Sequence, residues 1–229
     1  MKKLKELACS IVFTLFLLTS CTSVESNSIA PDASSTSKDS KEATAPTFQN
    51  GDIIFQTSNS SQSKAIQLAT HSPYSHVGII YEQKGAFWVY EAIEPVKLTP
   101  LKTWIKRGKK GHYVVKRLKN ASKVLSSTAL KKMKTAGEQY KGKHYDLYFE
   151  WSDDKIYCSE LVWKIYKEAL DIELGTLQQL ESFDLSNPIV KNKLQERYKG
   201  KIPLDEKVIS PADIFESSQL IEVDIPLKN

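Results

Sequence analysis

The sequence lacks several features that would place it in a common class of protein. Its longest apolar stretch, from about residue 7 to residue 18, is too short to span a bilayer comfortably. It contains no internal repeat and no motif typical of nucleic-acid binding, so we expect no nucleic-acid partner. His71, His112 and His144 show no metal-ligand spacing with acids or thiols. We therefore predict neither a metal nor a cofactor.

Cysteine is also scarce, with three in 229 residues, and two of these lie close to the N-terminus. Lys2, Lys3 and Lys5 precede the apolar stretch, which is the order found in a signal peptide. Small residues then lead to Cys21 in "LTSC", and this arrangement resembles the lipobox of bacterial lipoproteins. The resemblance implies that residues 1–20 are a signal peptide that is removed, and that Cys21 carries a lipid. An ordinary secretory signal is the alternative.

These features predict an exported bacterial lipoprotein of the cell envelope, anchored to a membrane that the sequence does not identify. Residues 21–47 are dominated by small and polar side chains, which predicts a flexible tether. Residues 48–229 contain all four tryptophans and have the size of one domain. The signal peptide takes three Lys and one Glu from 32 basic and 27 acidic residues, which leaves a net charge near +3. We interpret the basic clusters as solvated faces, with attraction to anionic lipid or wall polymer as the alternative.

Removal of Cys9 and lipidation of Cys21 would leave Cys158 without an intramolecular partner. Cys158 directly precedes apolar residues at helical spacing in "CSELVWKIYKEAL", which predicts that it begins an amphipathic helix. The free N–H groups and positive potential of a helix N-terminus stabilise a thiolate, the form of cysteine that attacks carbonyl groups. A buried core residue is the alternative and is the commoner case for a single cysteine.

His76 is the candidate base for this thiol. It begins the expected strand "HVGIIY", and "FWVYE" follows after a turn, so the two segments predict a hairpin. Glu91 then lies at the end of the hairpin that returns towards His76, where its carboxylate could orient the imidazole. Glu94 is the rival for this role, although it adjoins Pro95 beyond the expected strand. A surface histidine and a solvent-facing glutamate remain the alternatives.

The apolar patterns predict short strands and helices in one α+β fold, with the helices packed against an antiparallel sheet. The blocks "GDIIF", "SHVGIIY" and "YCSELVW" resemble those of the NlpC-type papain-like cysteine peptidases. Here the histidine block precedes the cysteine block, which is the order of the circularly permuted branch. The likeness is strongest to the YiiX-like proteins of that branch, and "YDLYFEW" and "ISPADI" add to it. It covers roughly residues 50–215.

The resemblance implies a papain-like fold with Cys158 as nucleophile, His76 as base and then acid, and Glu91 as the residue that orients His76. It also implies a peptidase or amidase that cleaves a small peptide, cell-wall fragment or acyl-amide through an acyl-enzyme. An acyltransferase or lipid hydrolase related to lecithin:retinol acyltransferase is one alternative. A binding module that has lost turnover is the other.

Four further residues are weaker candidates for the substrate cleft. Tyr74 and Ser75 precede the expected base, Tyr157 precedes the expected nucleophile, and Tyr145 lies in an aromatic segment. Turn chemistry and core packing offer alternative explanations for all four. The specificity of a papain-like cleft comes from its loops, which we expect in "YDLYFEWSDDK" and between residues 171 and 207.

Overall fold

The computed structural model describes residues 47–226. The predicted signal peptide, Cys21 and nearly all of the predicted tether lie outside the described residues. Between residues 47 and 226, no helix combines the length and the hydrophobicity that a membrane span requires. The domain boundaries and the lipid anchor therefore stay predictions.

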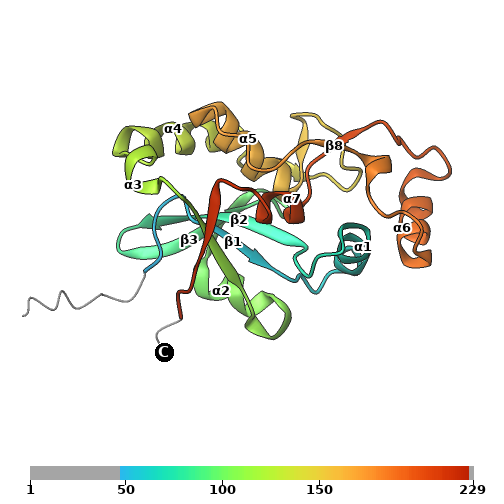
Figure 1. Ribbon diagram of the computed structural model, residues 1–229, viewed down its shortest axis with the longest axis horizontal. Helices are drawn as coiled ribbons and strands as arrows, with labels where there is room; N and C mark the ends of the chain where they lie inside the picture. The colour runs from blue at the N-terminus through green and yellow to red at the C-terminus, as the bar shows by residue number, and fades with distance from the viewer. Residues whose placement is uncertain (1–46, 227–229) are drawn as a thin grey trace, which may run out of the picture. The chain divides into compact units, whose positions relative to one another are not determined.

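An antiparallel sheet of six strands forms the centre of the fold (Figure 1). The expected hairpin is present, and both residues of its two-residue turn, Lys84 and Gly85, have positive φ, as a type I′ turn requires. The strand order is β10-β5-β1-β2-β3-β4. The bounds are β1 (Ile53–Gln56), β2 (His76–Gln83), β3 (Ala86–Glu91), β4 (Lys97–Pro100), β5 (Val114–Leu118) and β10 (Leu220–Val223).

Helices lie on both faces of this sheet. Figure 1 shows α4 and α5 above the sheet and α2 below it, while α1 and α6 lie beyond one end of the strands. The helices are α1 (Ser61–Thr70), α2 (Leu101–Arg107), α3 (Ala121–Val124), α4 (Ser127–Glu138), α5 (Cys158–Leu170), α6 (Pro188–Tyr198) and α7 (Pro211–Phe215), with 3-10 turns η1 (Lys109–Gly111) and η2 (Leu180–Ser182). Two small ladders pair β6 (His144–Tyr145) with β7 (Lys155–Ile156), and β8 (Gln178–Gln179) with β9 (Lys207–Val208). The arrangement is the predicted α+β fold.

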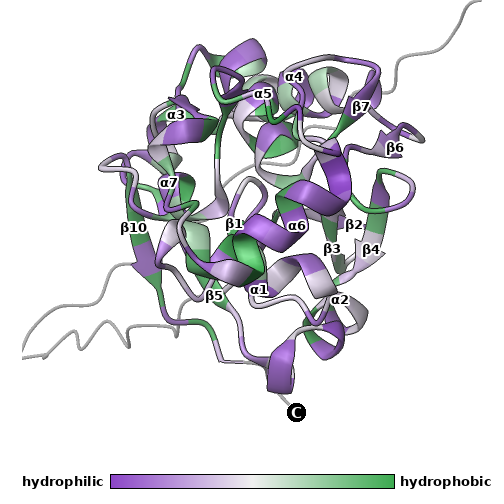
Figure 2. Cartoon of the chain, turned by 90° about the vertical axis from the view of Figure 1, so that its right-hand side faces the viewer, coloured by the Kyte–Doolittle hydropathy of each residue, from purple (hydrophilic) through white to green (hydrophobic). Residues whose placement is uncertain are grey.

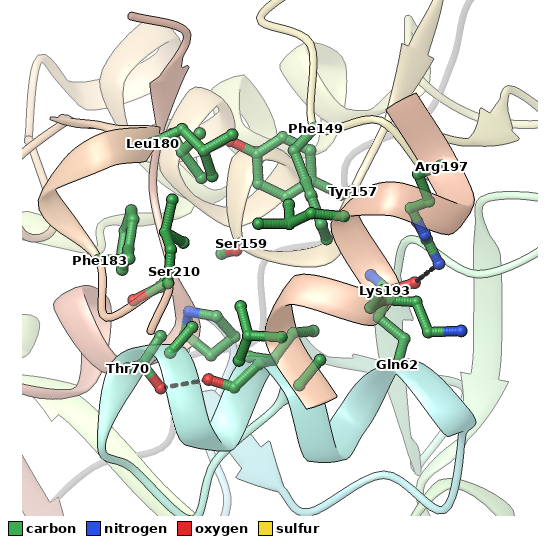
Figure 3. A pocket seen from close by; sticks show the side chains of 18 of the residues that line it. Gln62, Thr70, Phe149, Tyr157, Ser159, Leu180, Phe183, Lys193, Arg197 and Ser210 are labelled. Carbon is green, nitrogen blue, oxygen red and sulfur yellow. Dashed lines mark hydrogen bonds between the residues drawn. The ribbon is translucent and has the colours of Figure 1, made fainter. Parts of the chain in front are cut away.

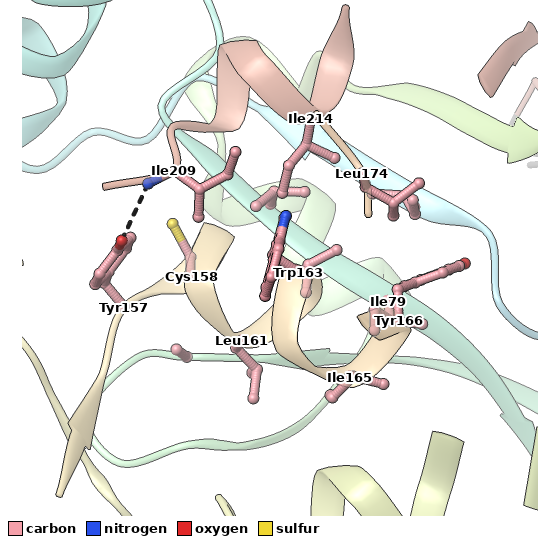
Figure 4. Packing of buried hydrophobic residues seen from close by; sticks show 14 of the residues in the cluster. Ile79, Tyr157, Cys158, Leu161, Trp163, Ile165, Tyr166, Leu174, Ile209 and Ile214 are labelled. Atoms are coloured by element: carbon pink, nitrogen blue, oxygen red, sulfur yellow. Dashed lines mark hydrogen bonds between the residues drawn. The ribbon is translucent and has the colours of Figure 1, made fainter. Parts of the chain in front are cut away.

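The core has two parts because successive strand residues point to opposite faces of the sheet. On β2, Val77 and Ile79 pack on the side of α5, whereas Ile80 packs with Trp104 on the side of α2. Figure 4 shows the larger part, in which the apolar stripe of α5 meets the sheet and the segment that carries Ile209. Helix α5 is therefore held along its length, which fixes the place of its first residue.

One segment that we expected to be a loop contains a helix. Residues 188–198 form α6, which Asn187 caps by accepting a hydrogen bond from the Ile189 N–H at 2.9 Å. Proline at the first helical position favours this start. Most of α6 is hydrophilic in Figure 2, and Val190 and Leu194 are its buried residues. The apolar side of α6 is too narrow to produce a helical pattern in the sequence, so Asn187-Pro188 was the available signal.

Candidate active site

His76 and Glu91 lie on neighbouring strands of the sheet. The register pairs Ile79 of β2 with Tyr90 of β3, so Gly78 lies opposite Glu91, with His76 on the same face one pleat further on. A side chain at Gly78 would collide with Val89, at 2.4 Å from its Cγ1. The absence of a side chain there lets β3 lie close to β2 at Glu91, whose Cβ is 3.4 Å from that position. His76 Nε2 lies 2.6 Å from Glu91 Oε2.

Glu91 is completely buried and is held by donors from the segment that follows it. Thr99 donates its hydroxyl to Oε1 at 2.6 Å, and Trp104 donates its indole N–H to Oε2 at 2.8 Å. Arg107, at the end of α2, also donates to Oε2. Burial acts to raise the pKa of Glu91, but His76, Arg107 and Thr99 outweigh it and lower this pKa to about 2. The carboxylate is therefore charged near neutral pH.

Cys158 is the first residue of α5 and is 2% exposed. Its thiol lies next to the His76 imidazole, the Val77 N–H and the Tyr145 hydroxyl, and these groups act to lower its pKa. Since Nε2 of His76 faces Glu91, Nδ1 is the nitrogen left for the thiol. The structure thus brings Cys158, His76 and Glu91 together in series, although Cys158 and His76 lie 82 positions apart in the sequence.

The electrostatics of this series favour a charged pair. Burial acts to raise the pKa of the Cys158 thiol, yet His76, the Val77 N–H and Tyr145 together lower it. Burial acts to lower the pKa of His76, yet its contacts with Cys158 and Glu91 raise it to about 9. A thiolate beside an imidazolium is the form in which a cysteine attacks a carbonyl carbon.

An apolar pocket adjoins Cys158 and ends between α1 and α6 (Figure 3). Its volume is about 90 Å³. A cavity needs roughly 10–15 Å³ to hold one water molecule, so this pocket has room for several atoms of a short chain. Tyr145 and Tyr157, both candidates from the sequence, line this pocket. The other apolar lining residues are Ala65, Ile66, Ala69, Phe149, Leu180, Phe183, Leu185, Val190, Leu194, Val208, Ile209 and Pro211.

The structure places the other sequence candidates away from this pocket. Tyr74 stacks on Phe215 with ring centroids 4.4 Å apart, so it packs under α7. Ser75 is buried, and its hydroxyl lies 2.6 Å from that of Ser63 in α1, a contact that joins a loop to a helix. Glu94 is exposed and pairs with His144 at 2.5 Å, not with His76.

Several residues of the site carry no signal in the sequence. Trp104 and Arg107 belong to a helix that the hydrophobic pattern does not indicate, and Thr99 lies on a short edge strand. Their contact with Glu91 depends on how β4 and α2 fold back over the hairpin. The exposed Arg107 side chain in particular resembles any other surface cation in the sequence.

Comparison with known proteins places this geometry in a family. The family model described as permuted papain-like amidase enzymes, YaeF/YiiX, C92 family, matches residues 47–224. The chain therefore belongs to the permuted papain-like amidases, and it is a cysteine hydrolase. YiiX of Escherichia coli strain K12 is 52% identical over 175 residues, which are 76% of this chain and 85% of YiiX. The crystal structure of YiiX from Escherichia coli O157:H7 matches with a TM-score of 0.74 and 52% identity, over 79% of this chain and 98% of that chain.

YiiX from Escherichia coli O157:H7 is described as a metalloprotein. Residues 47–226 of this chain contain no group of three or more His, Cys, Asp and Glu side chains that could hold a metal ion. His144 pairs with Glu94, and His71 pairs with Asp184, so each imidazole has one carboxylate beside it. This donor set does not fit a metal ion.

Proposed function

We propose that Cys158 is the nucleophile of an amidase, that His76 is its base and later its acid, and that Glu91 orients His76. The series from Cys158 through His76 to Glu91, with His76 Nε2 2.6 Å from Glu91 Oε2, is the observation that supports these roles. The lowered pKa of Cys158 and the raised pKa of His76 support a thiolate–imidazolium pair at neutral pH. Glu91 supplies the opposite charge that the imidazolium requires.

In the proposed reaction the Cys158 thiolate attacks the carbonyl carbon of an amide. A sulfur–carbon bond forms, and the carbonyl oxygen becomes an oxyanion. The first-turn N–H groups of α5, including that of Cys158, have no acceptor within the helix and can bind this oxyanion. His76 gives its proton to the departing amine, and the carbon–nitrogen bond breaks. His76 then takes a proton from water, and the hydroxide adds to the thioester carbon. The sulfur–carbon bond breaks, the carboxylic acid leaves, and the Cys158 thiolate beside the His76 imidazolium is restored.

The amidase family suggests a peptide or a cell-wall fragment as substrate. The pocket beside Cys158 supports a narrower choice, because its lining is almost entirely apolar. We propose that the acyl side of the scissile amide is aliphatic and lies between α1 and α6. The same pocket favours a second candidate, a lipid hydrolase or acyltransferase, in which Cys158 passes the acyl group of a lipid to water or to an alcohol or amine.

We also propose that the enzyme works in the cell envelope. Cys21 would carry the lipid that holds it to a membrane, and residues 21–47 would let the catalytic domain reach substrates near that surface. The order of charged, apolar and small residues before Cys21 supports this proposal.

The pH dependence of Cys158 alkylation by iodoacetamide tests the proposed triad. In the full chain we expect an inflection well below the free-thiol value of about 8.5. His76→Ala should remove that inflection, and Cys158→Ala should remove the label that mass spectrometry finds at position 158. Equal rates in wild type and His76→Ala would contradict the role of His76 as the activating base.

A substrate screen separates the two candidate reactions. Release of free amine from peptides, wall fragments or N-acyl amides, lost in Cys158→Ala, would support an amidase. Exchange of acyl groups between lipids without release of free acid would support the acyltransferase. Binding of these compounds with neither reaction would contradict both.

A further inference from the structure

The pocket beside Cys158 contains one buried polar group whose hydrogen-bonding capacity the fold does not use. Gln62, in the first turn of α1, lines the pocket and is 8% exposed. Its side-chain nitrogen, Nε2, is buried and has no hydrogen-bond partner among the described residues. A buried donor without an acceptor is unfavourable, so proteins rarely keep one without a reason.

The other polar side chains around the pocket are already engaged. The hydroxyls of Thr70 and Ser159 donate to the carbonyl oxygens of Ile66 and Ile209, at 2.8 and 2.7 Å. Ser210 donates to Asp213, Tyr198 donates to the Tyr148 carbonyl, and Lys193 pairs with Glu196. Gln62 differs from these residues because one of its polar atoms, Nε2, is buried and has no partner among the described residues.

The orientation of the Gln62 amide follows from its neighbour. Arg197 Nη2 lies 2.6 Å from Gln62 Oε1, and Figure 3 shows this contact between α6 and α1. A guanidinium group has donors and no acceptor, so the amide oxygen must be the atom that faces Arg197. The NH₂ group is therefore the unpaired end. Arg197 also donates to the Leu147 carbonyl, which holds it in this position.

We propose that Gln62 is a specificity-determining donor for the acyl group that Cys158 accepts. On this basis the group is an aliphatic chain with an acceptor oxygen, such as a keto, ether or amide oxygen, remote from the scissile carbonyl. The apolar walls take the chain, and Gln62 Nε2 donates to the oxygen. This inference rests on the proposed function, since it concerns the acyl half of the same substrate. A site that donates a hydrogen bond disfavours an analogue that cannot accept it.

Acylation of the full chain by two activated esters tests this inference. The probes are para-nitrophenyl heptanoate and the same ester with a keto oxygen near the far end of its chain. Attack by the Cys158 thiolate forms a thioester and releases para-nitrophenolate, so the burst of colour reports acylation whatever amine the natural substrate carries. Mass spectrometry confirms Cys158 as the acylated residue, and rates with a simple thiol correct for intrinsic reactivity.

We expect wild type to prefer the keto ester by on the order of tenfold, and Gln62→Leu to lose this preference while it still reacts with the plain ester. Gln67→Leu is the matched control, because Gln67 lies on α1 outside the pocket and bonds to Ser63. It should keep the wild-type ratio. A wild-type ratio near one, or a ratio unchanged in Gln62→Leu, would overturn the role of Gln62 and leave the proposed function intact. Failure of both esters to acylate Cys158 would overturn the proposed function and this inference with it.

Discussion

Glu91 receives hydrogen bonds from four side chains, which come from β2, β4 and α2. Three of them, those of His76, Trp104 and Arg107, share the single oxygen Oε2. Such crowding keeps the carboxylate ionised and in one orientation. Arg107 is the one of these that reaches solvent, with 40% of its side chain exposed. It is therefore the group through which the charge of the site can be changed with the least damage to packing.

We predict that Arg107→Gln moves the pH profile of Cys158 alkylation to higher pH. Arg107 helps to lower the pKa of Glu91, and loss of a nearby cation raises the pKa of every acid around it. Cys158 would form a thiolate at higher pH, and His76 would keep its proton to higher pH. The limb of the profile set by Cys158 and the limb set by His76 should both move to higher pH. The shift should be about one pH unit at most because Arg107 is partly exposed.

Two further variants separate charge from packing in this experiment. Arg107→Lys keeps the charge and should restore much of the profile, whereas Lys106→Gln removes the neighbouring exposed cation and should have no effect. A rate lowered equally at every pH, with both limbs in place, would contradict an electrostatic role for Arg107.

The residues that the sequence did predict at this site share a property that its other members lack. Cys158, His76 and Glu91 stand at the ends of regular elements whose periodicity is visible in the sequence, and the hairpin register relates two of them directly. Thr99, Trp104 and Arg107 reach the site through tertiary folding of β4 and α2. No local pattern contains that information. The unused donor of Gln62 likewise becomes apparent when α6 lies against α1.

At the scale of elements, α5 contains a buried ion pair, Glu160–Lys164, and Lys164 also ties the helix to the segment before it. Lys164 Nζ lies 2.8 Å from Glu160 Oε1 and 2.7 Å from Asp153 Oδ1, and it donates to the Ser152 carbonyl at 2.9 Å. Burial raises the pKa of Glu160 to about 8, although Lys164 opposes this rise. In the helical pattern of the sequence, both residues lie off the apolar stripe of α5. They are buried because the segment that follows Tyr145 covers that side of α5.

We predict that Lys164→Met destabilises the protein by about 1–3 kcal/mol, since the buried Glu160 carboxyl, whose pKa burial already raises to about 8, loses its Lys164 partner. Urea unfolding near neutral pH would measure the change. The double variant Glu160→Gln/Lys164→Met should recover part of the loss, because it removes the buried ionisable group that lost its partner. Lys167→Met is the control on the same helix, where the ion pairs of Lys167 lie at the surface, and it should unfold as wild type does. Equal stability of Lys164→Met and Lys167→Met would show that the buried pair contributes nothing.

At the scale of the whole molecule, the fold class and its permuted order were predictable because three sequence blocks carry them. The positions of α1 and α6 around the pocket were not, since α6 has almost no apolar pattern of its own. The N-terminal predictions rest on residue order alone. They need a measurement on the complete chain.

We predict that Cys21→Ser releases the protein from membranes. Lipidation at Cys21 would make a bacterial expression host hold the wild-type chain in the membrane fraction. The variant lacks the thiol that accepts the lipid, so it should be recovered without one. Fractionation and the mass of the N-terminal fragment would measure both effects. A wild-type chain that carries no added mass at Cys21 would contradict the lipoprotein proposal.

The permuted order also determines the order in which the residues of the site are synthesised. The residues that supply the imidazole, the carboxylate and the donors around it have all been synthesised once residue 107 is added. The residue that supplies the thiol follows about fifty residues later. One wall of the pocket, from Val208 to Pro211, and the edge strand β10 come about fifty residues after that. We expect a chain arrested after residue 200 to carry every reacting group and yet to have no closed acyl pocket. Competence for catalysis would then require residues 208–211, so it would arrive well after Cys158 is in place.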